Sequence, residues 1–153
     1  MKLAMRTLIK ISIIFVYMFS SCVFAQYHYC PSPDVVKANE NNVQAWEHEG
    51  LFWSITYRGW PYAEKIGFDQ VFYYPESNRL DCRYKWMNPK EPGTYLWTSV
   101  ELSPDADTTI VIAGKRWEVT DNFFMCHAGR TETCAFELKT QQHSWFERIF
   151  NDR

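Results

Sequence analysis

The stretch Asp69–Met87, DQVFYYPESNRLDCRYKWM, decides the fold class of this chain. On both sides of its centre every second residue is apolar or aromatic: Val71 and Tyr73, then Leu80, Cys82, Tyr84 and Trp86. A period of two is typical of a β-strand, because successive side chains point to opposite faces of a sheet. The intervening Tyr74–Asn78 contains Pro, Glu, Ser and Asn, which favour a turn. The stretch therefore predicts two antiparallel strands joined by a turn.

The same alternation continues outward in both directions, for example at Leu51, Trp53 and Ile55. Segments containing Pro, Gly, Asn and Asp separate the alternating runs, as in a β-meander. We expect strands at residues 51–58, 69–74, 79–87, 94–102, 108–113, 116–126 and 133–139. About seven short strands predict a mostly β fold, a single-domain antiparallel β-sandwich or partly closed barrel.

Two segments have helical rather than strand character. Residues 33–38 are expected to form one helical turn that begins at Ser32 or Asp34. Residues 143–150 have apolar side chains at positions 145, 146, 149 and 150, a spacing that predicts a short C-terminal helix.

Residues 1–25 are typical of a secretory signal peptide. Three basic residues precede a short apolar run, and Val23-Phe24-Ala25 suits cleavage after Ala25. Lipoprotein processing at Cys22 is the alternative. The remaining 26–153 form a single exported β domain with no transmembrane segment, which we expect to be periplasmic or secreted. All 18 acidic residues but only 13 of the 16 basic ones lie there, a net charge of −5 that disfavours nucleic acid as a partner.

The cysteines of residues 26–153 form an even set, Cys30, Cys82, Cys126 and Cys134, which predicts two disulfides in an exported domain. Three pairings are possible. Cys126 and Cys134 flank a short segment as they would in a hairpin, so we favour that pair, which leaves Cys30 to bind Cys82. A zinc site is disfavoured, because no two cysteines have a close C-x-x-C spacing.

Several landmarks together resemble a family of small exported Gram-negative bacterial proteins catalogued as a domain of unknown function. They are Cys30-Pro31-Ser32-Pro33, Trp53-Ser54, the aromatic segment Phe68–Pro75, Cys82-Arg83-Tyr84, and Cys126 with Cys134-Ala135-Phe136. These landmarks cover most of residues 30–138. The resemblance implies an exported domain of the same general kind, and it implies no activity and no site residues.

Signatures of catalysis are scarce in the sequence. It contains neither G-x-S-x-G nor H-E-x-x-H, and its four histidines are scattered, so no catalytic residue is assigned. Glu47-His48-Glu49 is interpreted as a solvated edge or turn. Asp105-Ala106-Asp107-Thr108 lacks the glycine and the distant glutamate of a calcium loop, and is interpreted as a capped turn. A small secreted hydrolase or glycan-active enzyme, with Asp69, Glu76 and Asp81 converging in a cleft, remains the alternative function.

A metal site is possible at the predicted new N-terminus, and no other cofactor is expected. If the chain begins Gln26-Tyr27-His28, its amino group, two amide nitrogens and the His28 imidazole form a square-planar set for Cu(II) or Ni(II). Cyclisation of Gln26 would block the amino group and remove this site.

Aromatic residues make up 18% of the chain, more than one inward-facing strand surface needs. Either both faces of the strands are covered, or some rings form an exposed patch that binds a partner. Trp60, Tyr62 and Trp97 are the candidate binding residues, because two lie in an expected loop and the third follows a Pro-Gly loop. The favoured function is a non-enzymatic binding module for a protein or an envelope glycan.

Overall fold

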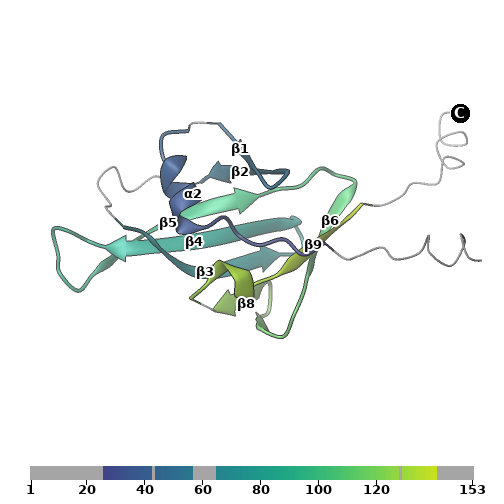
Figure 1. Ribbon diagram of the computed structural model, residues 1–153. Coiled ribbons are helices and arrows are strands. Elements are labelled where there is room, and N and C mark those ends of the chain that lie inside the picture. Colours follow the sequence, from purple (N-terminus) through teal and green to yellow (C-terminus); the bar gives the residue numbers. More distant parts are fainter. Residues whose placement is uncertain (1–25, 43, 57–64, 128, 141–153) are drawn as a thin grey trace, which may run out of the picture.

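The computed structural model describes residues 26–42, 44–56, 65–127 and 129–140, which form a mostly antiparallel β fold (Figure 1). The strands are Trp46–His48 (β1), Leu51–Ile55 (β2), Gly67–Tyr74 (β3), Arg79–Met87 (β4), Tyr95–Leu102 (β5), Thr108–Ile112 (β6), Trp117–Val119 (β7), Phe124–His127 (β8) and Phe136–Thr140 (β9). The predicted signal peptide and C-terminal helix lie outside the described residues.

The strands form an open seven-stranded sheet and a separate two-stranded sheet. The order in the large sheet is β1-β2-β5-β4-β3-β8-β7, and β6 pairs with β9. Strands β3, β4 and β5 follow one another as the expected meander, but β2 lies beside β5 instead of β3. This arrangement is a Greek key. The fold is sandwich-like, as predicted, and the large sheet does not close into a barrel.

Two strand predictions were wrong in detail. The expected strand 116–126 is a hairpin of β7 and β8, because the chain turns at Thr120–Phe123, where the Thr120 amide donates to the Phe123 carbonyl (2.9 Å). Strand β1 was not expected. It is joined to β2 by a two-residue turn in which Glu49 and Gly50 have φ angles of 52° and 76°, the left-handed conformation that a tight hairpin turn of this kind requires.

One face of the large sheet, the inner face, carries the hydrophobic core. The alternating residues that define it are fully or almost fully buried: Trp53, Val71, Tyr73, Leu80, Cys82, Tyr84, Trp86, Val100, Leu102 and Cys126. Helix α2 (Pro33–Ala38) covers part of this face and buries Val36. It begins where predicted, because the Ser32 side chain accepts a hydrogen bond from the Val35 amide.

The two-stranded sheet covers the rest of the inner face. The Phe136 ring of β9 meets the Trp53 ring edge to face, with centroids 6.5 Å apart. Asn78, in the β3–β4 turn, completes the edge of β6: its side-chain amide donates to the Thr108 carbonyl (2.7 Å), and its carbonyl oxygen accepts from the Ile110 amide (2.9 Å). A side chain thus replaces a neighbouring strand and joins the two sheets.

Both predicted disulfides are present, Cys30–Cys82 and Cys126–Cys134. The first fastens the N-terminal segment to the centre of the inner face, next to a hydrogen bond from the buried Tyr84 hydroxyl to the Pro31 carbonyl (2.6 Å). Burial raises the pKa of Tyr84 well above its usual value.

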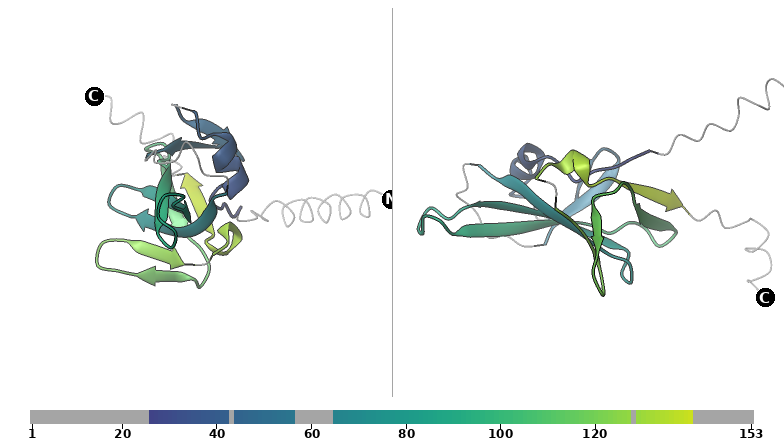
Figure 2. Two further views of the ribbon diagram at one scale, coloured as in Figure 1. Left: turned by 90° about the vertical axis from the view of Figure 1, so that its left-hand side faces the viewer. Right: turned by 90° about the horizontal axis from the view of Figure 1, so that it is seen from below.

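The expectation of a hairpin at the second disulfide was wrong. Cys126 lies in β8, whereas the chain after Cys134 enters β9 in the other sheet, since a 3-10 turn at Thr131–Thr133 redirects it. The left view of Figure 2 places the β7–β8 hairpin on the opposite side of the molecule from α2.

Candidate functional site

The other face of the large sheet, the outer face, carries the candidate site. On β4 the inner-face residues are Leu80, Cys82, Tyr84 and Trp86, and the outer-face residues are Arg79, Asp81, Arg83, Lys85 and Met87. No helix or strand of the described chain covers this face. Several of its side chains are exposed, among them Met87, Tyr95 and Trp97, whereas Phe72 and Asp81 are buried.

An aromatic platform, defined as Met87, Tyr95 and Trp97, lies at the end of the outer face where β4 turns into β5. Met87 is paired with Tyr95, and Lys85 with Trp97. The exposed fractions of Met87, Tyr95 and Trp97 are 59%, 45% and 48%. Met87, Tyr95 and Trp97 lie on the outer face because the residues next to them in the chain, including the buried Trp86, point to the inner face. At the platform, therefore, the surplus aromatic rings are exposed and not covered.

Of the predicted binding residues, Trp97 therefore lies in an exposed apolar cluster. Trp60 and Tyr62 lie outside the described residues. The described chain on either side of them runs close to the platform: the Thr56 amide donates to the Ser99 carbonyl (3.0 Å) on β5, and Gly67 is paired with Lys85.

A salt bridge between Asp69 and Lys85 lies beside the platform. A β-bulge between Phe68 and Gln70 inserts Asp69 into β3, which aims its carboxylate at Lys85. The Asp69 Oδ1 to Lys85 Nζ distance is 2.6 Å, and the ammonium lies 5.5 Å from the centre of the Tyr95 ring. The hydrogen bond and charge of Asp69 raise the pKa of Lys85, so Lys85 is a cation at neutral pH. One face of Tyr95 is thereby turned toward a fixed charge.

A polar row crosses the sheet next to the platform. Strand register places Ser99, Arg83, Gln70 and His127 side by side on β5, β4, β3 and β8. The Arg83 guanidinium lies 4.1 Å from the centre of the Phe72 ring, a cation–π contact. Within the described chain, Arg83 has no carboxylate at ion-pair distance, unlike Lys85 and Arg79. Its guanidinium is held against the Phe72 ring with no described carboxylate beside it.

Beyond Arg83 the outer face has a second charged cluster. Arg79 lies 3.6 Å from Asp81 and 4.0 Å from Glu101, and 4.6 Å from the centre of the Tyr74 ring. Asp81 is buried, and its Oδ1 has no hydrogen-bond partner in the described part of the chain. Burial raises the pKa of Asp81, and the positive charge of Arg79 opposes that rise.

The carboxylates of the alternative enzymatic hypothesis are spread along the β3–β4 hairpin. Asp69 is paired with Lys85 near one end, and Asp81, opposite Phe72, interacts with Arg79. Glu76 is exposed in the turn. In the described chain each of the two strand carboxylates lies against a cation, and Asp69, Glu76 and Asp81 are not gathered at one place; the carboxylate opposite Asp81 is that of Glu101 on β5.

The backbone of the predicted metal ligand His28 is hydrogen-bonded within the fold. Its amide donates to the Phe136 carbonyl (2.8 Å), and its carbonyl accepts from the Phe136 amide (3.0 Å). A copper ion bound through the His28 amide nitrogen would have to displace the first of these bonds. Among the described residues no group of three or more His, Cys, Asp or Glu side chains is placed to hold a metal.

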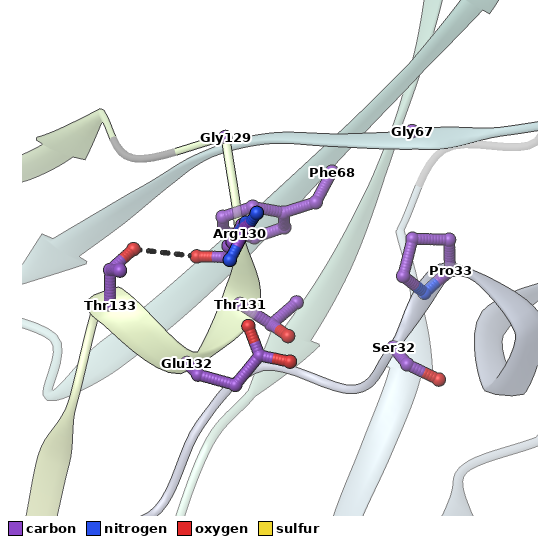
Figure 3. Close-up of a pocket in the computed structure, with 9 residues that line it drawn as sticks. All are labelled: Ser32, Pro33, Gly67, Phe68, Gly129, Arg130, Thr131, Glu132 and Thr133. Carbon is purple, nitrogen blue, oxygen red and sulfur yellow. Dashed lines mark hydrogen bonds between the residues drawn. The ribbon is translucent and has the colours of Figure 1, made fainter.

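A separate groove of about 660 Å³ opens on another part of the surface (Figure 3). It is lined by Ser32, Pro33, Gly67, Phe68, Gly129, Arg130, Thr131, Glu132 and Thr133. Phe68 supplies the main apolar surface, and the Thr133 hydroxyl donates to the Arg130 carbonyl (2.7 Å). Arg130 and Glu132 are both exposed to solvent. The sequence carried no signal for this groove, because it forms where three distant segments meet.

The chain matches no family model, no curated protein and no solved structure at a significant level. In the described part of the chain, no helix is long and apolar enough to cross a membrane. Function is therefore inferred from side-chain geometry.

Proposed function

We propose that this protein is a non-enzymatic binding module of the cell envelope or the extracellular medium, and that the outer face of its large sheet is the binding surface. The observation that carries this proposal is the aromatic platform, three large apolar side chains exposed together on the two central strands of the sheet. Exposed aromatic clusters favour partner binding, because covering them removes apolar area from water.

The platform is also held rigidly. Its residues lie on β4 and β5, which pair along eight consecutive positions, and Lys85 is held by Asp69. Strand pairing fixes the backbone positions of these residues, so their spacing is set before a partner binds, and this favours affinity.

The compartment is inferred from the disulfides together with the predicted signal peptide. Two buried disulfides are typical of proteins that fold in an oxidising environment. The landmarks resemble an exported Gram-negative family, which agrees with this compartment. We include membership of that family in the proposal.

The test is an affinity capture with a matched control. The full chain, exported through its own N-terminal segment, carries a C-terminal tag and is purified with both disulfides formed. Envelope extract is passed over the wild type, Trp97→Ala and Phe52→Ala. Phe52 is also exposed on the outer face, at 65%, but lies on β2 away from the platform.

We expect components that bind the wild type and Phe52→Ala and are lost with Trp97→Ala. Equal retention by all three proteins would show that the platform is not the binding surface and would overturn the proposal.

A further inference from the structure

We infer that the partner is a glycan carrying carboxylate groups, with sugar rings lying on the aromatic platform and a carboxylate bound by Arg83. This inference rests on the proposed function and names its ligand class. Three features of the outer face support it: the spacing of the rings, a guanidinium that has no carboxylate of the described chain at ion-pair distance, and the balance of the surrounding charges.

The platform has the spacing that a short run of sugars requires. Tyr95 and Trp97 are two residues apart on one strand and point to the same side, so their positions are separated by about 7 Å. Aromatic faces present a broad apolar surface, which fits the C–H face of a pyranose ring. Two rings at this spacing therefore suit an extended chain of sugars.

Arg83 lies where a substituent of such a sugar would reach. It is paired with Ser99, and Trp97 is two residues from Ser99 on the same strand, so Arg83 and Trp97 are diagonal neighbours, about 7–8 Å apart. Its guanidinium is stacked on Phe72, which leaves the N–H edge for a planar anion. A carboxylate matches that edge with two parallel hydrogen bonds.

The groups beside Arg83 suit sugar hydroxyls. Gln70 and Ser99 are its cross-strand neighbours on either side, and both are partly exposed. An amide and a hydroxyl can each donate and accept hydrogen bonds, as a sugar hydroxyl does. Polar side chains beside an aromatic platform thus complement both the polar and the apolar surfaces of a sugar.

The surrounding charges favour isolated carboxylates over a dense polyanion. On β3, β4 and β5 the outer face carries three cations, Arg79, Arg83 and Lys85, and three acids, Asp69, Asp81 and Glu101; strand register adds Glu47 on β1 and Glu118 on β7. Lys85 and Arg79 lie within 4.0 Å of an acid, whereas Arg83 has no carboxylate of the described chain at that distance and is the best placed of the three to bind an anion. A double-stranded nucleic acid or a polyphosphate carries its charges more densely and would place further negative charges against these carboxylates, whereas a polyuronate presents at most one carboxylate per sugar ring.

The size of the platform favours a glycan over a folded protein. A standard protein interface buries about 800 Å² on each partner, contributed by about 20–30 residues, around an apolar core. The platform has three exposed apolar side chains, and the residues beside it are charged or polar. This composition suits a narrow chain of sugars.

The experiment is affinity electrophoresis of the full oxidised chain in gels that contain polygalacturonate, alginate or hyaluronate. Each polymer is compared with its carboxyl-reduced counterpart, which keeps the sugar chain but removes the charge. The proteins are wild type, Trp97→Ala, Arg83→Gln and the control Phe52→Ala, each with its folding verified by circular dichroism.

We expect at least one acidic polymer to retard the wild type and Phe52→Ala. Trp97→Ala and Arg83→Gln should bind it at least about tenfold more weakly, the cost of a lost stacking surface or a lost hydrogen-bonded charge pair. Carboxyl reduction should weaken binding of the wild type and leave Arg83→Gln unchanged.

Retardation by none of the three polymers, or equal retardation after carboxyl reduction, would overturn the inference. The proposed function would survive that result if envelope capture still depended on Trp97, which would then indicate a protein partner. Loss of the Trp97 dependence in the capture experiment would instead overturn both.

Discussion

The two faces of strand β4 come from one alternating sequence and differ in almost every property. Leu80, Cys82 and Tyr84 are fully buried on the inner face. On the outer face Arg79, Arg83 and Lys85 each lie against an aromatic ring, of Tyr74, Phe72 and Tyr95 respectively. The inner face is covered by α2 and the two-stranded sheet, whereas no helix or strand of the described chain covers the outer face. One strand can thus line the core with one face and carry charged and aromatic side chains on the other, because its period of two separates the two sets of residues.

Removing an inner-face ring should have the largest effect. Trp53→Ala deletes a fully buried side chain that contacts Phe136 and is expected to lower the free energy of unfolding by about 3–5 kcal/mol, through lost burial and a residual cavity. Urea denaturation measures this change. A loss below about 1 kcal/mol would mean that the two sheets are not joined through this contact.

Opening the disulfide on the inner face should come next. Cys30→Ala combined with Cys82→Ala removes a link across 52 positions and should cost about 4 kcal/mol, chiefly because the unfolded chain gains freedom. Opening Cys126–Cys134, which spans 8 positions, should cost less, about 2.5 kcal/mol. Thermal and urea unfolding of the two double variants side by side gives the comparison, and equal losses would contradict this chain-entropy explanation.

A smaller, pH-dependent effect is expected at Asp81, the buried acid of the outer face. Its pKa is raised above 3.8 by burial, so the folded state holds this proton more tightly than the unfolded state does. Stability contributed by this group is therefore lost as pH rises from 3.8 through the raised pKa. Asp81→Asn should be more stable than the wild type at pH 7, and the difference should shrink as pH falls toward 3.8.

Urea denaturation of both proteins between pH 3.5 and 7 tests the Asp81 prediction. A difference that grows as pH falls would contradict the assigned direction of the pKa shift.

The smallest effect on stability is expected on the platform. Trp97→Ala should change the free energy of unfolding by no more than about 0.5 kcal/mol, because the ring is half exposed and no helix or strand of the described chain packs over it. The same variant should abolish capture of the envelope partner. A loss of stability comparable with that of Trp53→Ala would show that Trp97 is a core residue and remove the distinction between the two faces.

Much of the fold was predictable because it depends on local patterns. The hairpin of β3 and β4 followed from alternation around the Pro-containing turn, and the helix start followed from the capping preference of Ser32. Both disulfides were the favoured pairing. The hairpin within 116–126 was missed, although Asp121 and Asn122 interrupt the alternating pattern and favour a turn at that place.

The candidate site was predictable only in part. Trp97 was singled out as a surplus aromatic residue, and alternation alone indicated that it faces away from Trp86. Arg83 was not singled out, because it is one of three cations that alternate along the same strand face, with Arg79 and Lys85. The two arginines differ in their distances to carboxylates on other strands, and no local pattern encodes those distances.

The sequence by itself determined which residues of each strand share a face and where the main turns fall, because these properties depend on neighbours a few positions apart. Its even set of cysteines also indicated an oxidising compartment. Only the tertiary structure decided that β2 lies beside β5, that Asn78 completes the edge of β6, and that Asp69 binds Lys85 while Arg83 has no carboxylate of the described chain at ion-pair distance. These outcomes depend on which distant segments bury the inner face together. That choice is made by packing of the whole chain and sets the register that gives the outer face its chemistry.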